Sequence, residues 1–216
     1  MKAMDIAVLV YPRLTVLDAV GPYEVLSRIP GATVTFVAET KGAVRSDVGS
    51  LGLVADASLD ELSGPDIVVV PGGPGQTDLM DDGPVHEWLR SAHETTTWTT
   101  SVCTGSLILA AAGILDGVRA TSHWLAMDQL ERYGAIPVSE RVVEDGEVMT
   151  AAGVSSGIDM GLTLAARLVG PEIAQTIQLG IEYDPQPPFD AGSPGTAPDF
   201  AIEFLRSQSR FVLEGR

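Results

Sequence analysis

The chain has 216 residues, of which 45% are hydrophobic and 19% are charged, and its formal net charge is -16. This composition is typical of a folded protein with a sizeable buried core and excludes wholesale disorder. The excess of 29 acidic over 13 basic residues disfavours binding to nucleic acids and to anionic membranes, because phosphate groups attract lysine and arginine.

The beginning of the chain and its single cysteine bear on compartment and on metals. The segment MKAMDIAVLV has one lysine, a short apolar run and no small-residue cleavage site, so it does not resemble a secretory signal. No apolar run is long enough to span a bilayer, which favours a cytoplasmic protein. One cysteine excludes an intrachain disulfide, and no group of His, Asp or Glu has metal-ligand spacing, so we expect no metal site.

In the first half of the chain, short Val- and Ile-rich runs alternate with amphipathic runs, which predicts βαβ units and a mainly parallel sheet. The predicted strands are 6–11, 33–39, 66–70 and 95–102. One predicted helix begins at Gly21-Pro22, with the proline in the first turn, and another covers 84–94. Between them, the turn-rich segment 43–59 predicts a short excursion of the hairpin type.

The second half is richer in helical patterns. Helices are predicted over 106–115, 123–134, 156–170, 171–183 and 199–213, the second of them closed by Gly134. Asp-Gly within 141–151 predicts a hairpin, and the Pro- and Gly-rich segment 184–198 predicts an irregular course over the surface. We therefore expect a single α/β domain over 1–216, a three-layer α/β/α sandwich with a mainly parallel central sheet.

The only cysteine, Cys103, stands where a predicted strand meets a predicted helix, in TTSVCTGSLILAAAGIL. This order resembles a nucleophile elbow, in which a sharp turn exposes a reactive side chain above the sheet. A helix N-terminus is expected to lower the thiol pKa, and the N–H of Thr104 would face an anion beside the sulfur. The alternative is an inert buried thiol, since free cysteine is among the most buried residue types. The position at the end of a core strand favours the functional interpretation.

Two further positions could act together with Cys103. The loop PGGPG (71–75) follows a predicted strand, and its backbone N–H groups could face the thiol, although a tight turn would also require its glycines. Asp18 lies among apolar residues, where a carboxyl group tends to keep its proton, but an Asp near a helix start is commonly a cap. Glu24 is interpreted as an exposed helical residue and His123 as a structural histidine.

Together these motifs resemble the ThiJ/PfpI superfamily, from VLVYPRLTVLDAVGPYEVL through VVVPGGPG and SVCTGSLILAAAGILDGVRATSHW to SSGIDMGLTLAARLVG. The resemblance implies a flavodoxin-like fold similar to class I glutamine amidotransferases. Peptidase-like members carry His where this chain has Thr104, and chaperone, deglycase or glyoxalase members carry Glu where it has Asp18. Cys-Thr-Gly with Asp is shared by isonitrile hydratases and by the N-terminal domains of AraC-type regulators. The segment EYDPQPPFDAGSPGTAP is similar to its isonitrile hydratase counterpart, and the end at Arg216 leads us to expect a stand-alone form.

The resemblance also implies a reaction, the hydration of a small-molecule isonitrile to an N-substituted formamide through a covalent cysteine thioimidate, without a cofactor. Cys103 is then the nucleophile and Asp18 the acid and base, with Thr104 beside them. Gly72, Gly73 and Val154 are expected to support the substrate or a developing anion. A homodimer is expected as well. The alternatives are a cysteine-based redox or ligand sensor and a glyoxalase- or deglycase-like enzyme.

Overall fold

A seven-stranded sheet with the order β10-β11-β7-β6-β1-β2-β5 forms the centre of the molecule. The computed structural model describes residues 3–209. The strands of this sheet are β1 (Met4–Leu9), β2 (Ala32–Ala38), β5 (Ala57–Ser58), β6 (Ile67–Val70), β7 (Trp98–Val102), β10 (Val142–Asp145) and β11 (Val148–Ala151). All neighbouring pairs are parallel except β10 and β11, which confirms the predicted mainly parallel sheet.

The two central strands, β1 and β6, are apolar on both faces. Residues 6–9 and 67–70 are almost completely buried, as expected for strands of a parallel sheet that is covered on both sides. From β1 the chain continues to β2 on one side, whereas from β6 it continues to β7 on the other. The connections that follow β1 and β6 therefore diverge, and a crevice at the carboxyl ends of these strands is where ligands bind in such folds.

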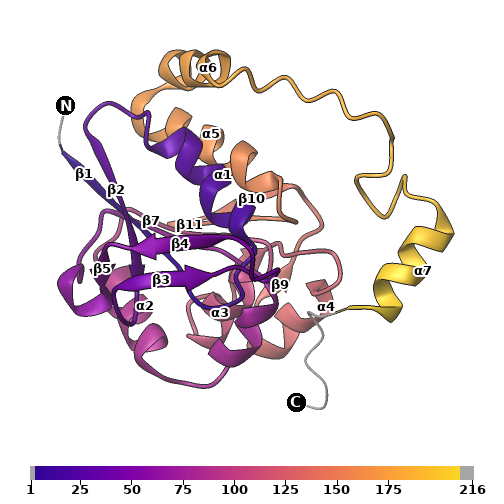
Figure 1. The fold of residues 1–216 in the computed structure, drawn as a ribbon, viewed down its shortest axis with the longest axis horizontal. Helices are drawn as coiled ribbons and strands as arrows, with labels where there is room; N and C mark the ends of the chain where they lie inside the picture. The colour runs from indigo at the N-terminus through magenta and orange to yellow at the C-terminus, as the bar shows by residue number, and fades with distance from the viewer. Residues whose placement is uncertain (1–2, 210–216) are drawn as a thin grey trace.

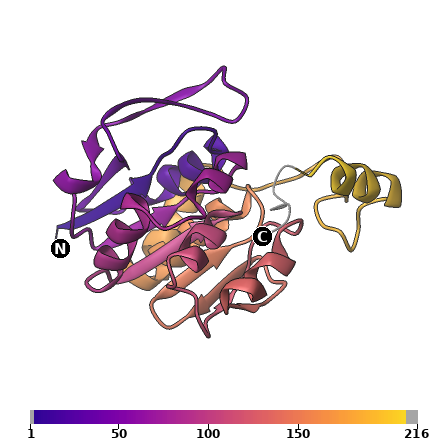
Figure 2. The same ribbon diagram turned by 90° about the horizontal axis from the view of Figure 1, so that it is seen from below.

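Helices cover both faces of the sheet (Figure 1). On one side, α1 (Val16–Leu26) packs against α5 (Ser156–Val169), which in turn packs against α6 (Pro171–Gly180). On the other side lie α2 (Pro84–His93) and α3 (Gly105–Ala111), which contact each other (Figure 2). The predicted flavodoxin-like sandwich is confirmed. Within residues 3–209, no helix is both long and apolar enough to cross a membrane.

The predicted start of the first helix is wrong. Helix α1 begins at Val16, so Pro22 lies inside it and not in its first turn. A proline inside a helix removes one backbone hydrogen bond, here the bond to the carbonyl of Asp18. Pro22 is buried against α5, where a Cβ on Gly157 would lie only 3.1 Å from its Cδ. This close packing of two helices compensates for the missing bond. Because α1 begins at Val16, Asp18 lies in its first turn and not in a connection before it.

The shorter elements agree with the predicted order, with different boundaries. The excursion contains the hairpin of β3 (Gly42–Arg45) and β4 (Gly52–Ala55), and Gly146 at φ 59° turns the chain between β10 and β11. Helix α3 ends at Ala111, before its predicted end, and the predicted helix 123–134 is reduced to α4 (Met127–Leu130) and a 3₁₀ turn closed by left-handed Gly134. The short strands β8 (Arg119–Ala120) and β9 (Ile136–Pro137) were not predicted.

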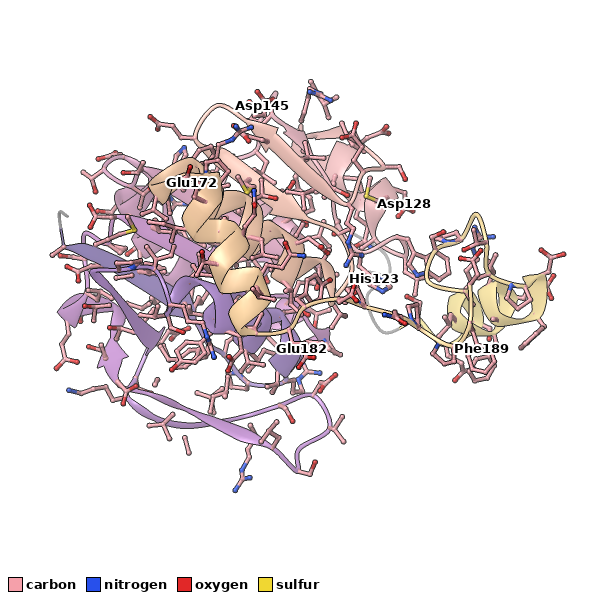
Figure 3. All side chains as sticks on the ribbon, turned by 90° about the horizontal axis from the view of Figure 1, so that it is seen from above. His123, Asp128, Asp145, Glu172, Glu182 and Phe189 are labelled. Carbon is pink, nitrogen blue, oxygen red and sulfur yellow. The ribbon has the colours of Figure 1, made fainter. Side chains whose placement is uncertain are left out.

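The C-terminal part of the described chain extends away from the sheet. Residues 184–198 contain no helix or strand, as predicted, and they lead to α7 (Asp199–Ser207). Residues 210–213 of the predicted last helix lie outside the described residues. We call residues 184–207 the C-terminal arm. Figure 3 places Phe189 on this arm, away from the sheet, and its side chain is exposed.

Candidate active site

Cys103 occupies a sharp turn between β7 and α3, with a φ of 58°. This left-handed conformation is uncommon for a residue other than glycine and persists only where the surroundings hold it. The N–H of Cys103 donates to the carbonyls of Ala151 (3.0 Å) and Ala152 (2.8 Å). Its own carbonyl accepts from the hydroxyls of Ser106 and Ser122, both at 3.1 Å. These four bonds fix the turn, so the sharp strand-to-helix turn predicted from the sequence is present, but the thiol is completely buried and not exposed as a nucleophile elbow implies.

The loop PGGPG packs directly against this turn. A Cβ on Gly72 would overlap the backbone nitrogen of Thr104, and a Cβ on Gly105 would overlap the carbonyl oxygen of Val70. The glycines therefore allow two backbone segments to come closer than any side chain permits. Gly73 has a φ of 133°, so it also serves the tight turn that was the alternative interpretation of this loop.

Asp18 reaches this contact from the first turn of α1. Its side chain is completely buried, and its Oδ2 accepts a hydrogen bond from the N–H of Gly72 at 3.0 Å. The carboxyl group of Asp18 and the thiol of Cys103 lie close enough for each to shift the pKa of the other. The prediction that Asp18 caps its own helix is therefore wrong, because its carboxylate bonds to Gly72, which is far away in the sequence.

Backbone N–H groups of the site face three groups, namely the carboxylate of Asp18, the hydroxyl of Thr104 and the sulfur of Cys103. The backbone N–H groups of Thr104 and Val154 favour the ionised form of the Cys103 thiol and lower its pKa, against the larger effect of burial. The hydroxyl of Thr104 accepts from the N–H of Gly73 at 3.0 Å. The loop PGGPG thus holds Asp18 and Thr104, and the second N–H that favours the ionised thiol comes from Val154 at the beginning of the α5 region.

Burial controls the acid–base properties of the pair. Burial raises the pKa of Asp18 to about 7, although the hydrogen bond from Gly72 and the nearby thiol of Cys103 oppose this shift. Burial, together with the negative charge of Asp18, raises the pKa of the Cys103 thiol well above its ordinary value. The predicted lowering of the thiol pKa is therefore wrong, because loss of solvation outweighs the effect of a short helix. Near neutral pH, a protonated thiol faces a carboxyl group that can accept its proton.

His123 and Glu24 have other surroundings. His123 is half-buried, its Nδ1 accepts from the N–H of Leu125 at 3.3 Å, and burial lowers the pKa of its ring. A Cβ on Gly153 would lie 3.0 Å from its Cδ2, so the ring is packed against the loop that precedes Val154. Glu24 forms an exposed ion pair with Arg28 at 2.7 Å and is not part of the site.

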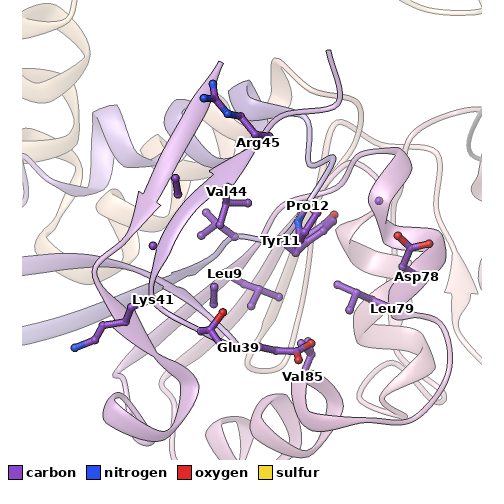
Figure 4. A pocket seen from close by; sticks show the side chains of 16 residues that line it. Leu9, Tyr11, Pro12, Glu39, Lys41, Val44, Arg45, Asp78, Leu79 and Val85 are labelled. Atoms are coloured by element: carbon purple, nitrogen blue, oxygen red, sulfur yellow. The ribbon is translucent and has the colours of Figure 1, made fainter. Parts of the chain in front are cut away.

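Two cavities are lined by residues that surround the pair of Cys103 and Asp18, although neither of these two side chains lines them. The first, which we call the Val154 cavity, has a volume of about 470 Å³ and is bounded by Val154, by the His123 region and by residues 192–194 of the C-terminal arm. The second, the Tyr11 cavity, measures about 590 Å³ and lies between Tyr11, the β3–β4 hairpin and the start of α2 (Figure 4). The Val154 cavity thus shares Val154, Ser122 and Ala152 with the surroundings of the pair, and the Tyr11 cavity shares Tyr11.

Three supporting residues were missed by the sequence analysis. Ser106 stands three residues after Cys103, a spacing at which a hydroxyl commonly bonds a nearby backbone carbonyl, so a local signal existed. Ser122 and Tyr11 come from other parts of the chain and carry no local signal. Within residues 3–209, no group of three or more His, Cys, Asp or Glu side chains is placed to hold a metal ion.

Comparisons with known proteins identify similar sequences and a similar structure. The model of the DJ-1/PfpI family matches residues 4–167. The isonitrile hydratase of Pseudomonas putida is 44% identical over 214 residues, which cover 99% of this chain and 93% of that protein. The HTH-type transcriptional regulator CdhR of Pseudomonas aeruginosa is 36% identical over 122 residues, covering 56% of this chain and 36% of that protein. The crystal structure of a ThiJ/PfpI family protein from Pseudomonas syringae has a TM-score of 0.93 at 40% identity, covering 96% of this chain and 86% of that one.

Proposed function

Because the chain belongs to the DJ-1/PfpI family, we propose that it is an isonitrile hydratase, an enzyme that adds water to an isonitrile (R–N≡C) to give an N-substituted formamide. The observation that carries this proposal is the buried pair of Cys103 and Asp18, which holds a protonated thiol against a carboxyl group with a pKa of about 7. The identity of 44% to an isonitrile hydratase over nearly the whole chain supports it.

The first step joins the sulfur to the terminal carbon of the isonitrile. This carbon accepts a nucleophile while one π pair of the carbon–nitrogen triple bond moves to nitrogen, and the lone pair that the carbon already carried is left as a negative charge on it. A nucleophile and a proton donor are therefore needed at the same carbon. Asp18 takes the thiol proton as the sulfur of Cys103 attacks, and it passes this proton to the carbon. The product is a neutral thioimidate, R–N=CH–S–Cys103, and the N–H groups of Thr104 and Val154 stabilise charge on the sulfur during its formation.

The second step is hydrolysis of the thioimidate. Asp18, again ionised, takes a proton from water while the oxygen bonds to the carbon, and it passes this proton to the imine nitrogen. The resulting R–NH–CH(OH)–S–Cys103 loses its carbon–sulfur bond, the carbon–oxygen double bond forms, and the sulfur regains a proton. The formamide leaves, and the pair again holds one proton. The cycle balances without an oxidant, a reductant or a cofactor.

The proposed activity is tested by incubating the purified protein with an aryl isocyanide and measuring the formamide by chromatography. We expect turnover, and intact-mass measurement after acid quenching should show the protein increased by the mass of one isonitrile. Absence of turnover would exclude the function. Consumption of methylglyoxal instead would point to a glyoxalase- or deglycase-like enzyme. A sensor role has less physical support, because a buried thiol with a raised pKa forms little of the thiolate that peroxides oxidise.

We assign the substrate to the Val154 cavity, since Val154 lines this cavity and its backbone N–H favours the ionised form of Cys103. The change Val154→Phe fills part of this cavity while keeping the backbone N–H. We expect it to raise KM for a bulky aryl isocyanide about tenfold. A pocket that is too small by the volume of a few methylene groups binds its substrate more weakly by about this factor. The matched control is Ala43→Phe, which narrows the Tyr11 cavity and should leave KM unchanged. The opposite pattern would assign the substrate to the Tyr11 cavity.

We also propose that the chain forms a homodimer, as members of the family it resembles typically do. Helix α7 has no buried residue, and Phe200, Phe204 and Leu205 are exposed by 75%, 64% and 45%. We infer that this apolar face packs against a second copy of the chain. Light scattering after size-exclusion chromatography should give about twice the monomer mass of 22.7 kDa, and Phe200→Glu together with Phe204→Glu should shift it towards the monomer. A wild-type protein of monomer mass contradicts the proposal.

A further inference from the structure

Tyr11 is a buried residue just after β1 that the proposed mechanism does not use. Only 4% of its surface is exposed, and its ring forms a wall of the Tyr11 cavity (Figure 4). Its hydroxyl donates a hydrogen bond of 2.9 Å to the carbonyl oxygen of Pro71. A buried hydroxyl needs such a partner, so the bond is explained locally. The bond also restrains the peptide group that Pro71 shares with Gly72.

The carbonyl of Pro71 and the N–H of Gly72 belong to the same peptide group. A peptide group is planar, so its carbonyl and its N–H point in opposite directions and rotate together. The N–H of Gly72 donates to Oδ2 of Asp18 at 3.0 Å. Tyr11 and Asp18 are therefore bonded to the two ends of one rigid unit, and the hydroxyl of Tyr11 sets the direction in which the N–H points.

This peptide group needs such a restraint because a glycine follows it. Gly72 cannot carry a side chain, since a Cβ would overlap the backbone of Thr104, and glycine permits backbone rotations that other residues resist. The next peptide group is already fixed, because the carbonyl of Gly72 accepts from the N–H of Thr15 at 2.9 Å, directly before α1. The bond from Tyr11 holds the peptide group on the other side of Gly72.

We propose that Tyr11 is a positioning residue, which holds the Pro71–Gly72 peptide group so that its N–H faces the carboxylate of Asp18 next to Cys103. Tyr11 touches no reacting atom in this scheme and acts through Gly72. The consequence for the site is electrostatic as well as geometric, because the bond from Gly72 favours the ionised form of Asp18. The titratable groups that influence Asp18 are Cys103, Tyr11 itself and Asp47 of the β3–β4 hairpin. The role in catalysis rests on the proposed function, whereas the effect on Asp18 does not.

The variant Tyr11→Phe removes the hydroxyl and keeps the ring. We expect kcat to fall about tenfold with KM nearly unchanged, as the loss of one buried hydrogen bond predicts. The acid limb of the kcat profile should move to higher pH by about half a unit or more, because Asp18 loses a donor that favours its ionised form. A merely structural role would not move this limb. The matched control is Tyr23→Phe, the same change on α1, where the ring packs against Phe36.

The titration of Asp18 can also be measured without any substrate, by ¹³C NMR of its carboxyl carbon in the full chain. In Tyr11→Phe this titration should occur at higher pH than in the wild type, and in Tyr23→Phe it should not move. If the wild type fails to hydrate isonitriles but this shift is seen, the positioning role stands and the proposed function fails. If the wild type is active and the titration and the acid limb are both unchanged in Tyr11→Phe, the positioning role is wrong.

Discussion

Replacing Cys103 with alanine is expected to abolish isonitrile hydration, with a loss of kcat of about 10⁴-fold or more. The reason is that the sulfur forms the covalent bond to the isonitrile carbon, and no neighbouring group can take its place, since Cys103 is the only cysteine of the chain. The measurement is formamide production from an aryl isocyanide under single-turnover conditions. Thermal unfolding of the variant should resemble that of the wild type, because alanine keeps the Cβ and the backbone bonds of the turn.

The covalent intermediate gives a second readout for the same variant. Acid quenching of the wild type during turnover should trap protein that carries one isonitrile, whereas Cys103→Ala should show only the unmodified mass. Cys103→Ser is a useful companion, because it keeps a donor to Asp18 but supplies a far weaker nucleophile. If either variant retained the full rate, the isonitrile would not be attacked by this side chain and the proposed mechanism would be wrong.

Much of the fold could be predicted from local patterns. The apolar runs of β1 and β6 are characteristic of strands buried on both faces, and the Asp-Gly turn between β10 and β11 is a strong local signal. The start of α1 could not be predicted, because Pro22 is tolerated inside the helix only through its packing against Gly157. The rule that proline occupies the first turn of a helix holds for an isolated helix. In this protein, tertiary packing allows α1 to begin before Pro22.

The same division applies to the candidate site. The sharp turn at Cys103 is a local feature, since strand, cysteine and helix follow one another directly in the sequence. The acid–base state of the thiol is not local, because it depends on burial and on Asp18, which α1 brings to the turn from another part of the chain. The link from Tyr11 through the Pro71–Gly72 peptide group to Asp18 joins three segments, and no spacing along the sequence indicates it.

The variant Asp18→Asn is expected to lower kcat by about 10²- to 10⁴-fold, the usual contribution of a general acid or base. Asparagine retains an oxygen that can accept from the N–H of Gly72, so the fold of the loop should be preserved, but it can neither take the proton from Cys103 nor deliver it to the isonitrile carbon. Glu24→Gln, which neutralises an exposed carboxylate on the same helix, should leave the rate unchanged. Wild-type activity in Asp18→Asn would remove Asp18 from the mechanism.

In the wild type, the pH profile of kcat should rise through the titration of Asp18, near pH 7. Activity requires one proton shared by the pair, so the rate falls at low pH, where both groups are protonated, and again at high pH, where both have lost their protons. The second decline should lie at alkaline pH, because the pKa of the thiol is raised. A profile without an acid limb between about pH 6 and 8 would contradict this assignment of the base.

The same carboxyl group should make the protein less stable as the pH rises, and Asp18→Asn should remove this effect. Asp18 ionises near pH 3.8 in the unfolded chain and near pH 7 in the folded protein, so between these values only the unfolded state releases the proton. The free energy of unfolding therefore decreases from about pH 4 to about pH 7, by up to about 4 kcal/mol for this difference in pKa. Denaturation at pH 4 should show similar stability for the wild type and Asp18→Asn, whereas at pH 8 the variant should be the more stable by a few kcal/mol. A variant that is less stable than the wild type at pH 8 would contradict this prediction. It would show that the ionised carboxylate of Asp18 stabilises the folded state.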